Sequence, residues 1–157
     1  MDSEIGREVF EYARRGLSSD LKQALLESHP DRYVAYDGSS AFLMAVKNGH
    51  TSSAELLYSK GADASRRTDD GSTALLLAAA TGNVVLVELL LKVRLCDLNE
   101  PNEDGFTPLD IAHHYQHLEI VAVLKSHGGQ HGVSQTQCSS GEVICGPSEK
   151  WGYGVFD

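Results

Sequence analysis

The sequence has few cysteines, few aromatic residues and no long apolar run. Its 157 residues include three cysteines, Cys96, Cys138 and Cys145, and none of them forms a CxxC pair. An odd number without paired spacing favours neither a disulfide framework nor a zinc knuckle. No stretch approaches the roughly 20 apolar residues that cross a bilayer, and the acidic start MDSEIGREVF lacks a secretory pattern. We therefore expect a cytoplasmic protein, with the nucleus as an open second compartment.

Basic residues are outnumbered by acidic ones. Thirteen Lys and Arg against 22 Asp and Glu give a formal net charge of −9. Nucleic acids and anionic membranes are bound by clustered positive charge, so we expect neither as a ligand. The same balance favours a protein partner with a basic segment, chiefly by speeding association.

Catalytic motifs are also missing. The sequence has no nucleophile elbow, no paired-carboxylate constellation, and neither GxGxxG nor GxxxxGK, so we predict no enzyme activity and no cofactor. The one chemical candidate is HHYQH, where neutral imidazoles of His113, His114 and His117 could share a metal ion. However, Tyr115 and Gln116 fall where the chain should turn between helices, and the glutamate of HExxH is missing. A metal-dependent activity there is the least favoured alternative.

The sequence does contain a repeat of about 33 residues. The strings DGSSAFLMAVKNGH, DGSTALLLAAATGN and DGFTPLDIAHHYQH begin at Asp37, Asp70 and Asp104. Two rows of glycines recur at intervals of 33 or 34 residues: Gly38, Gly71 and Gly105, and Gly16, Gly49 and Gly82. A period marked twice independently indicates a repeat architecture.

Each unit predicts a turn followed by two helices. The Asp-Gly pair favours a tight turn, and Ser40, Thr73 and Thr107 can then cap the first, alanine-rich helix. Pro108 suits a first helical position. The second helix has apolar residues three and four apart, which predicts one buried stripe, and Gly61 is expected to end it.

The motifs DGFTPL at 104–109 and KGAD at 60–63 resemble those of the ankyrin repeat. The resemblance implies an all-α ankyrin-repeat solenoid of helix-turn-helix units, with projecting β-turn or hairpin loops and a C-terminal extension. We place the repeat domain at residues 1–130 and the extension at 131–157. The predicted repeats cover about 4–36, 37–69, 70–103 and 104–130; the first lacks the DGxT turn, as terminal repeats often do.

Several residues depart from the family pattern. Leu43 and Leu76 replace the usual histidine of the first helix, and we expect both to pack between repeats. Gln116 stands where the glycine between the two helices should be. The loop at 94–102 contains one additional residue, so we predict the main local irregularity there.

Proteins of this family bind partners on a concave face formed by the turn tips and the first helices. Carried over by position, the resemblance implies these contact residues: Tyr36, Asp37, Ser39, Lys47, Asn48, Asp69, Asp70, Ser72, Ala80, Thr81, Glu103, Asp104, Phe106, His114 and Tyr115. Tyr36, Phe106 and Tyr115 are the expected aromatic anchors of an acidic groove. For the turn aspartates Asp70 and Asp104, however, we favour the interpretation that they brace their turns, more than for Asp69 and Glu103.

We therefore predict a non-catalytic protein-interaction module, an adaptor, scaffold or inhibitor that is monomeric when free. The alternative is an assembly chaperone or regulatory subunit that holds a basic client protein. A complex strongly weakened by salt would favour the chaperone. A repeat scaffold serves many unrelated recognitions, so the partner cannot be named from the sequence.

The extension at 131–157 changes in composition along its length. It begins rich in Gly, Ser and Gln, which is typical of a linker. Its second half carries large apolar residues that a solvated tail rarely has: Val143, Ile144, Trp151, Tyr153 and Phe156. We hypothesise that these residues dock on the repeats, as a cap on the last repeat or in the groove. A free linear motif for a partner is the alternative.

Overall fold

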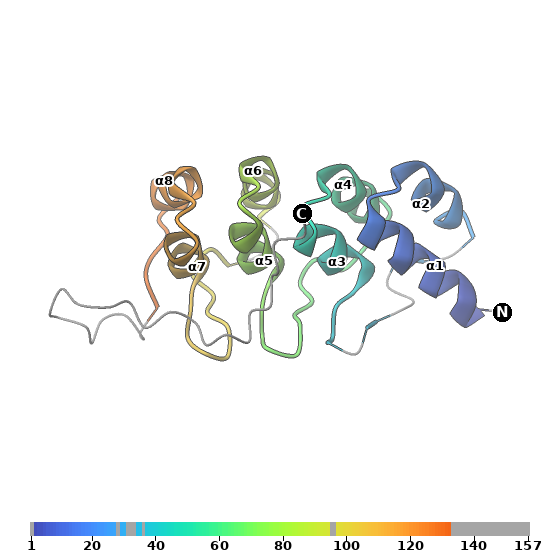
Figure 1. The fold of residues 1–157 in the computed structure, drawn as a ribbon, viewed down its shortest axis with the longest axis horizontal. Helices are drawn as coiled ribbons and strands as arrows, with labels where there is room; N and C mark the ends of the chain where they lie inside the picture. Colours follow the sequence, from blue (N-terminus) through green and yellow to red (C-terminus); the bar gives the residue numbers. More distant parts are fainter. Residues whose placement is uncertain (1, 28, 31–33, 36, 95–96, 133–157) are drawn as a thin grey trace, which may run out of the picture.

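The computed structural model describes residues 2–27, 29–30, 34–35, 37–94 and 97–132. In this part, eight α-helices form four antiparallel pairs that stack side by side (Figure 1). In chain order they are α1 (Asp2–Arg15), α2 (Ser18–Ala24), α3 (Ala41–Lys47), α4 (Thr51–Ser59), α5 (Ala74–Thr81), α6 (Val84–Val93), α7 (Pro108–His114) and α8 (Leu118–Ser126). The described part contains no strand, only an isolated bridge between Val34 and Ser40. The predicted all-α solenoid is confirmed.

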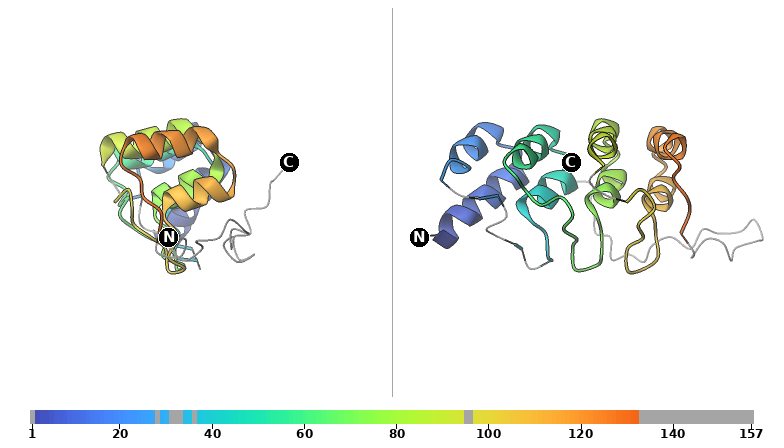
Figure 2. Two further views of the ribbon diagram at one scale, coloured as in Figure 1. Left: turned by 90° about the vertical axis from the view of Figure 1, so that its left-hand side faces the viewer. Right: turned by 180° about the vertical axis from the view of Figure 1, so that it is seen from behind.

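The helices lie in two layers. The odd-numbered helices form an inner row and the even-numbered helices an outer row, while loops project to one side of the inner row (Figures 1 and 2). Each inner helix packs on its own outer helix, and consecutive inner helices from α1 to α7 pack on one another. Adjacent repeats therefore share one continuous core, as expected for a solenoid.

Hydroxyl caps define where three of the inner helices begin. The side-chain oxygens of Ser40, Thr73 and Thr107 each accept a hydrogen bond from the backbone N–H three residues later, at 3.3, 3.4 and 3.4 Å. Pro108 occupies the first turn of α7, where its missing N–H leaves no bond unmade. The predicted caps are confirmed.

Small side chains let the inner helices pack closely. Every residue of α5 from Ala74 to Ala80 is buried, because this helix lies between α3, α6 and α7. Leu43 and Leu76 have exposed fractions of 0% and 1%, so their predicted packing is confirmed. Burial of an aliphatic side chain of this size contributes about 1.5–3 kcal/mol.

The turns between helices bond each repeat to the one before it. Asn83 Nδ2 donates to Gly49 O at 3.0 Å, and His117 Nε2 lies 3.2 Å from Ala80 O. Gly82 has a φ of 74°, and a Cβ there would lie 2.7 Å from the ring of His117. Glycine therefore meets two requirements at this turn, a left-handed backbone and room for the next repeat.

The loop after α6 contains the predicted irregularity. Arg94 adopts a φ of 51°, a left-handed conformation that glycine usually takes after a helix. The regular pattern has returned by Asp97, whose Oδ1 accepts a bond from Asn99 N at 3.0 Å. The same bond joins Asp63 Oδ1 and Ser65 N in the preceding repeat. The extra residue is therefore accommodated before Asp97.

Candidate functional site

Three projecting turns, which we call fingers, have the same hydrogen-bonded geometry. We number each finger by the repeat that follows it. Finger 2 comprises residues 35–39, finger 3 residues 68–72 and finger 4 residues 102–106. In each, the glycine N–H donates to a carbonyl three residues earlier, at 3.1, 2.9 and 3.0 Å. The first N–H also donates to the last carbonyl, at 2.9, 3.1 and 3.0 Å. These paired bonds close all three fingers in the same way, and they give fingers 3 and 4, which are described throughout, one defined shape.

Neighbouring fingers are bonded to one another. Asp69 N donates to Asp37 O at 2.9 Å, and Glu103 N donates to Asp70 O at 3.2 Å. Gly38 permits this approach, because a Cβ there would lie 2.6 Å from Asp69 Oδ1. The fingers thus form a connected row beneath the inner helices (Figure 1).

The finger tips carry most of the predicted carboxylates on the surface. Asp69, Asp70, Glu103 and Asp104 are exposed, whereas Asp37 is partly buried. Asp70 accepts hydrogen bonds from the hydroxyls of Thr68 and Ser72 within its own finger. Asp70 therefore braces its turn and still presents its carboxylate to solvent. The structural role and the predicted contact role are thus compatible at this residue.

Asp37 has a different environment from the other tip carboxylates. Burial would raise its pKa, but hydrogen bonds from Ser39 and the charge of Lys47 outweigh burial, and the pKa lies below its ordinary value. Lys47 Nζ lies 3.5 Å from Asp37 Oδ2. The negative charge of Asp37 is thus partly neutralised by Lys47, the last residue of α3.

Four predicted contact residues lie in the interior, which corrects their expected exposure. Ser39 and Ser72 are fully buried, because the residue after each turn glycine points toward the inner helices. Phe106 has an exposed fraction of 8% and packs into the hydrophobic core, and Ala80 is buried in α5. Phe106 therefore cannot serve as an exposed aromatic anchor in this conformation.

The ends of the inner helices supply the remaining predicted contacts. Asn48 and His114 are exposed, while Lys47, Thr81 and Tyr115 are partly buried. The rings of His114 and Tyr115 meet edge to face with centroids 4.9 Å apart. Burial raises the pKa of the Tyr115 phenol. This ring packs against the hydrophobic core and is still partly exposed, as an aromatic anchor is.

Some predicted residues lie outside the described part of the chain. They are Tyr36 and the proposed docking residues Val143, Ile144, Trp151, Tyr153 and Phe156.

The three histidines of HHYQH do not converge on one point. His113 lies beside His131 with ring centroids 5.1 Å apart, His114 contacts Tyr115, and His117 is bonded to the preceding repeat. Among the described residues, no group of three His, Cys, Asp or Glu side chains could hold a metal ion. The metal-dependent alternative does not fit this arrangement, because the interhelical turn separates His117 from the other two.

Sequence reasoning missed a segment that follows α8, which we call the strap (residues 128–132). Gln130 N donates to Asn99 Oδ1 at 2.6 Å, and Thr107 Oγ1 donates to Gln130 O at 2.8 Å. Gly132 N donates to Asp110 Oδ2 at 2.7 Å. The buried Asp110 was recognisable only as the last residue of a T-x-x-D capping pattern, and its contact with the strap had no sequence signal.

The strap brings two histidines together, and this predicts a pH effect. Burial is the main cause that lowers the pKa of His113, and the charges of His131 and Lys125 lower it further, while Asp110 opposes them. A histidine with a lowered pKa binds a proton less readily in the folded state than in the unfolded state. The free energy of unfolding therefore decreases as the pH falls below the ordinary pKa of 6.5. We expect His113→Gln to reduce the loss of stability between pH 7.5 and about 5.

Urea unfolding of both proteins at each pH measures this effect. A pH dependence identical in wild type and variant would contradict the assignment to His113. His127→Gln, on an exposed histidine at the end of α8, is the control.

The geometry defines a helical-repeat solenoid with a row of fingers, and comparison with known proteins identifies its class. A family model described as ankyrin repeats in three copies matches residues 42–135, more than half of the chain. The chain belongs to the ankyrin repeat family. Ankyrin repeats generally mediate protein–protein interaction, and the family is generally non-enzymatic.

The relatives are much longer than the matched part. An ankyrin repeat protein of fowlpox virus is 32% identical over 123 residues, which cover 77% of this chain and 28% of the relative. Serine/threonine-protein kinase 12 of Arabidopsis thaliana is 32% identical over 60% of this chain and 20% of the kinase. The mitochondrial liver glutaminase of Rattus norvegicus is 32% identical over 60% of this chain and 16% of the glutaminase. The alignments thus cover less than a third of each relative.

In the described ranges, every helix is too short or too polar to cross a membrane.

Proposed function

We propose that this chain is a non-catalytic interaction module, an adaptor, scaffold or inhibitor, that binds a protein through its concave face and finger tips. The basic segment of that partner lies against the carboxylates. The observation that carries the proposal is the hydrogen-bonded row of fingers, which holds exposed acidic side chains on fingers 3 and 4 at a fixed spacing. Opposite charge on a partner would steer association and set its register.

Two features, one of the finger row and one of the inner helices, support this proposal. The bonds from Asp69 to Asp37 and from Glu103 to Asp70 order the fingers before any partner binds, so binding costs less conformational entropy. The inner helices offer a second, uncharged contact surface. It consists of Tyr115 together with Thr81 and Asn48 on the neighbouring repeats. We propose Tyr115 in place of the buried Phe106 as the aromatic contact.

The charge prediction is tested with two isosteric substitutions at the tips. We expect Asp69→Asn combined with Glu103→Gln to weaken the complex about 5- to 30-fold, because each exposed ion pair contributes about 0.5–1 kcal/mol. The control is Glu55→Gln with Glu88→Gln, which makes the same change in net charge on exposed residues of α4 and α6. A partner obtained by affinity capture is purified and titrated calorimetrically against wild type and both variants.

The comparison of the two double variants decides the outcome. Equal weakening by both would mean that only net charge matters, and unchanged affinity in both would contradict the acidic-finger contact. Titration at low and high salt distinguishes the two roles left open by the sequence. Affinity that collapses in salt would favour the chaperone for a basic client, since exposed charges are screened.

A further inference from the structure

The strap follows the path that links one repeat to the next. Gly128 N donates to Lys125 O at 3.0 Å, as Gly61 N donates to Tyr58 O at 2.9 Å after α4. Both glycines have a left-handed φ, of 91° and 89°. After α4, this path leads into the third repeat. The strap therefore leads the chain over the C-terminal end of the array, where a fifth repeat would begin.

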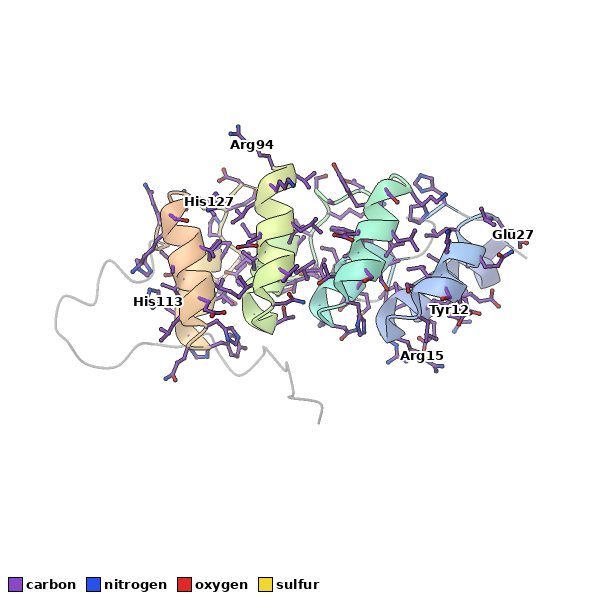
Figure 3. All side chains as sticks on the ribbon, turned by 90° about the horizontal axis from the view of Figure 1, so that it is seen from above. Tyr12, Arg15, Glu27, Arg94, His113 and His127 are labelled. Atoms are coloured by element: carbon purple, nitrogen blue, oxygen red, sulfur yellow. The ribbon has the colours of Figure 1, made fainter. Side chains whose placement is uncertain are left out.

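The side chains at this end differ from those of internal repeats. The third residue of the inner helix is Leu76 in α5 and Asp110 in α7, and the sixth is Ala79 and His113. Leu76 and Ala79 are buried in α5, which packs on α7 of the following repeat. Asp110 contacts His131 and Gly132 of the strap instead, and His113 lies at the end of the row in Figure 3. The strap therefore covers the α7 part of this end.

The α8 part of the same end presents an apolar residue to solvent. Leu118, the first residue of α8, has an exposed fraction of 72%. Thr51, the first residue of α4, is contacted by the next repeat through a 3.1 Å bond from Asn83 Nδ2 to its Oγ1. The first position of α4 thus faces the following repeat, and at the equivalent Leu118 the described residues supply no such cover.

We propose that residues 133–157 fold back over the C-terminal end face, which we define as His113, Leu118 and the strap, and seat their apolar side chains on Leu118. The 25 residues after Gly132 can reach about 80 Å when extended. The helices of a packed pair lie only about 10 Å apart. The segment contains large apolar residues that can cover Leu118, including Trp151 and Phe156.

Charge favours this face over the groove. Residues 133–157 contain Glu142, Glu149 and Asp157 against Lys150, a side-chain net charge of −2. The exposed carboxylates of fingers 3 and 4 would repel the segment. Beside Leu118, Glu119 and Lys125 carry opposite charges, and Lys125 lies close enough to lower the pKa of His113. The concave face then stays open, so this inference does not rest on the proposed function.

Trp151 reports directly on the proposed contact, because it is the only tryptophan in the chain. In the full chain we expect blue-shifted Trp151 emission that acrylamide quenches weakly. Leu118→Asp should raise the quenching constant several-fold, toward the value in urea. An aspartate suits the first turn of a helix, so the variant should keep its fold, which circular dichroism checks.

Val85→Asp is the matched control, because Val85 has an exposed fraction of 63% in the first turn of α6, one repeat inward. It should leave quenching unchanged. Four results would overturn the proposal: Trp151 as accessible in the native chain as in urea, no effect of Leu118→Asp, equal effects of both variants, or protection that depends on protein concentration. The last result would indicate a second copy as the occupant, and loss of protection in Thr81→Arg alone would indicate the groove.

Discussion

Replacing Asp110 with alanine is expected to lower the free energy of unfolding by about 2–6 kcal/mol, because two buried backbone N–H groups lose their acceptor. The carboxylate is buried and accepts hydrogen bonds from Thr107 N at 3.0 Å and Gly132 N at 2.7 Å. His131 Nδ1 lies 2.6 Å from its other oxygen. The substitution leaves the two backbone donors without an acceptor, and each unsatisfied buried group costs about 1–3 kcal/mol. Water can replace the contact of the exposed His131.

Urea unfolding followed by circular dichroism measures this loss, and Asp70→Ala provides the control. Asp70 also accepts hydrogen bonds from two hydroxyls, but it is exposed at a finger tip, where water can replace them. We expect a loss of about 1 kcal/mol or less for the control. A loss at Asp110 no larger than at Asp70 would show that the strap does not stabilise the array.

Gly82→Ala is expected to lower the free energy of unfolding by about 2–4 kcal/mol. A side chain at a φ of 74° costs roughly 1–2 kcal/mol. The added Cβ would also lie 2.7 Å from the ring of His117, and crowding in a packed contact costs about 1–3 kcal/mol. The ring must then move away and lose its contact with Ala80 O.

Gly49→Ala separates these two contributions. Gly49 has the same φ of 74°, but the nearest atom to an added Cβ is Asn83 Nδ2 at 3.8 Å. The control should therefore lose only the backbone contribution, about 1–2 kcal/mol. Thermal and urea unfolding of both variants give the difference. Equal losses would mean that the interface with the next repeat accommodates a methyl group without strain.

Periodic features were predictable because they arise from short segments. The caps at Ser40, Thr73 and Thr107 depend on residues three positions apart, and the structure confirms them. Gln116 was recognised as a departure from glycine, and its φ of 59° shows that the backbone at this turn is unchanged. Gln116 belongs to the fourth repeat, so within the described chain no following histidine ring presses on it as His117 presses on Gly82.

The candidate site was only partly predictable, because the sequence pattern marks the residues of a turn without showing which of their side chains are buried. Asp69 and Glu103 are exposed as their places in the turns imply, whereas Ser39, Ser72 and Phe106 are directed into the core. Phe106 is an aromatic residue next to a turn glycine, which describes a surface anchor and a core residue equally well. Only the packing against neighbouring side chains distinguishes the two.

The sequence by itself determined the fold class, the repeat period, the helix caps and the acidic character of the finger tips, because these depend on local pattern and composition. The tertiary structure alone decided which residues of the fingers are buried and how the fingers are bonded to one another. It also decided that Asp110 receives the strap 22 residues later in the chain. All of these contacts join residues that are far apart in sequence, and the contact between Asp110 and the strap occurs in one repeat only, so it leaves no periodic signal.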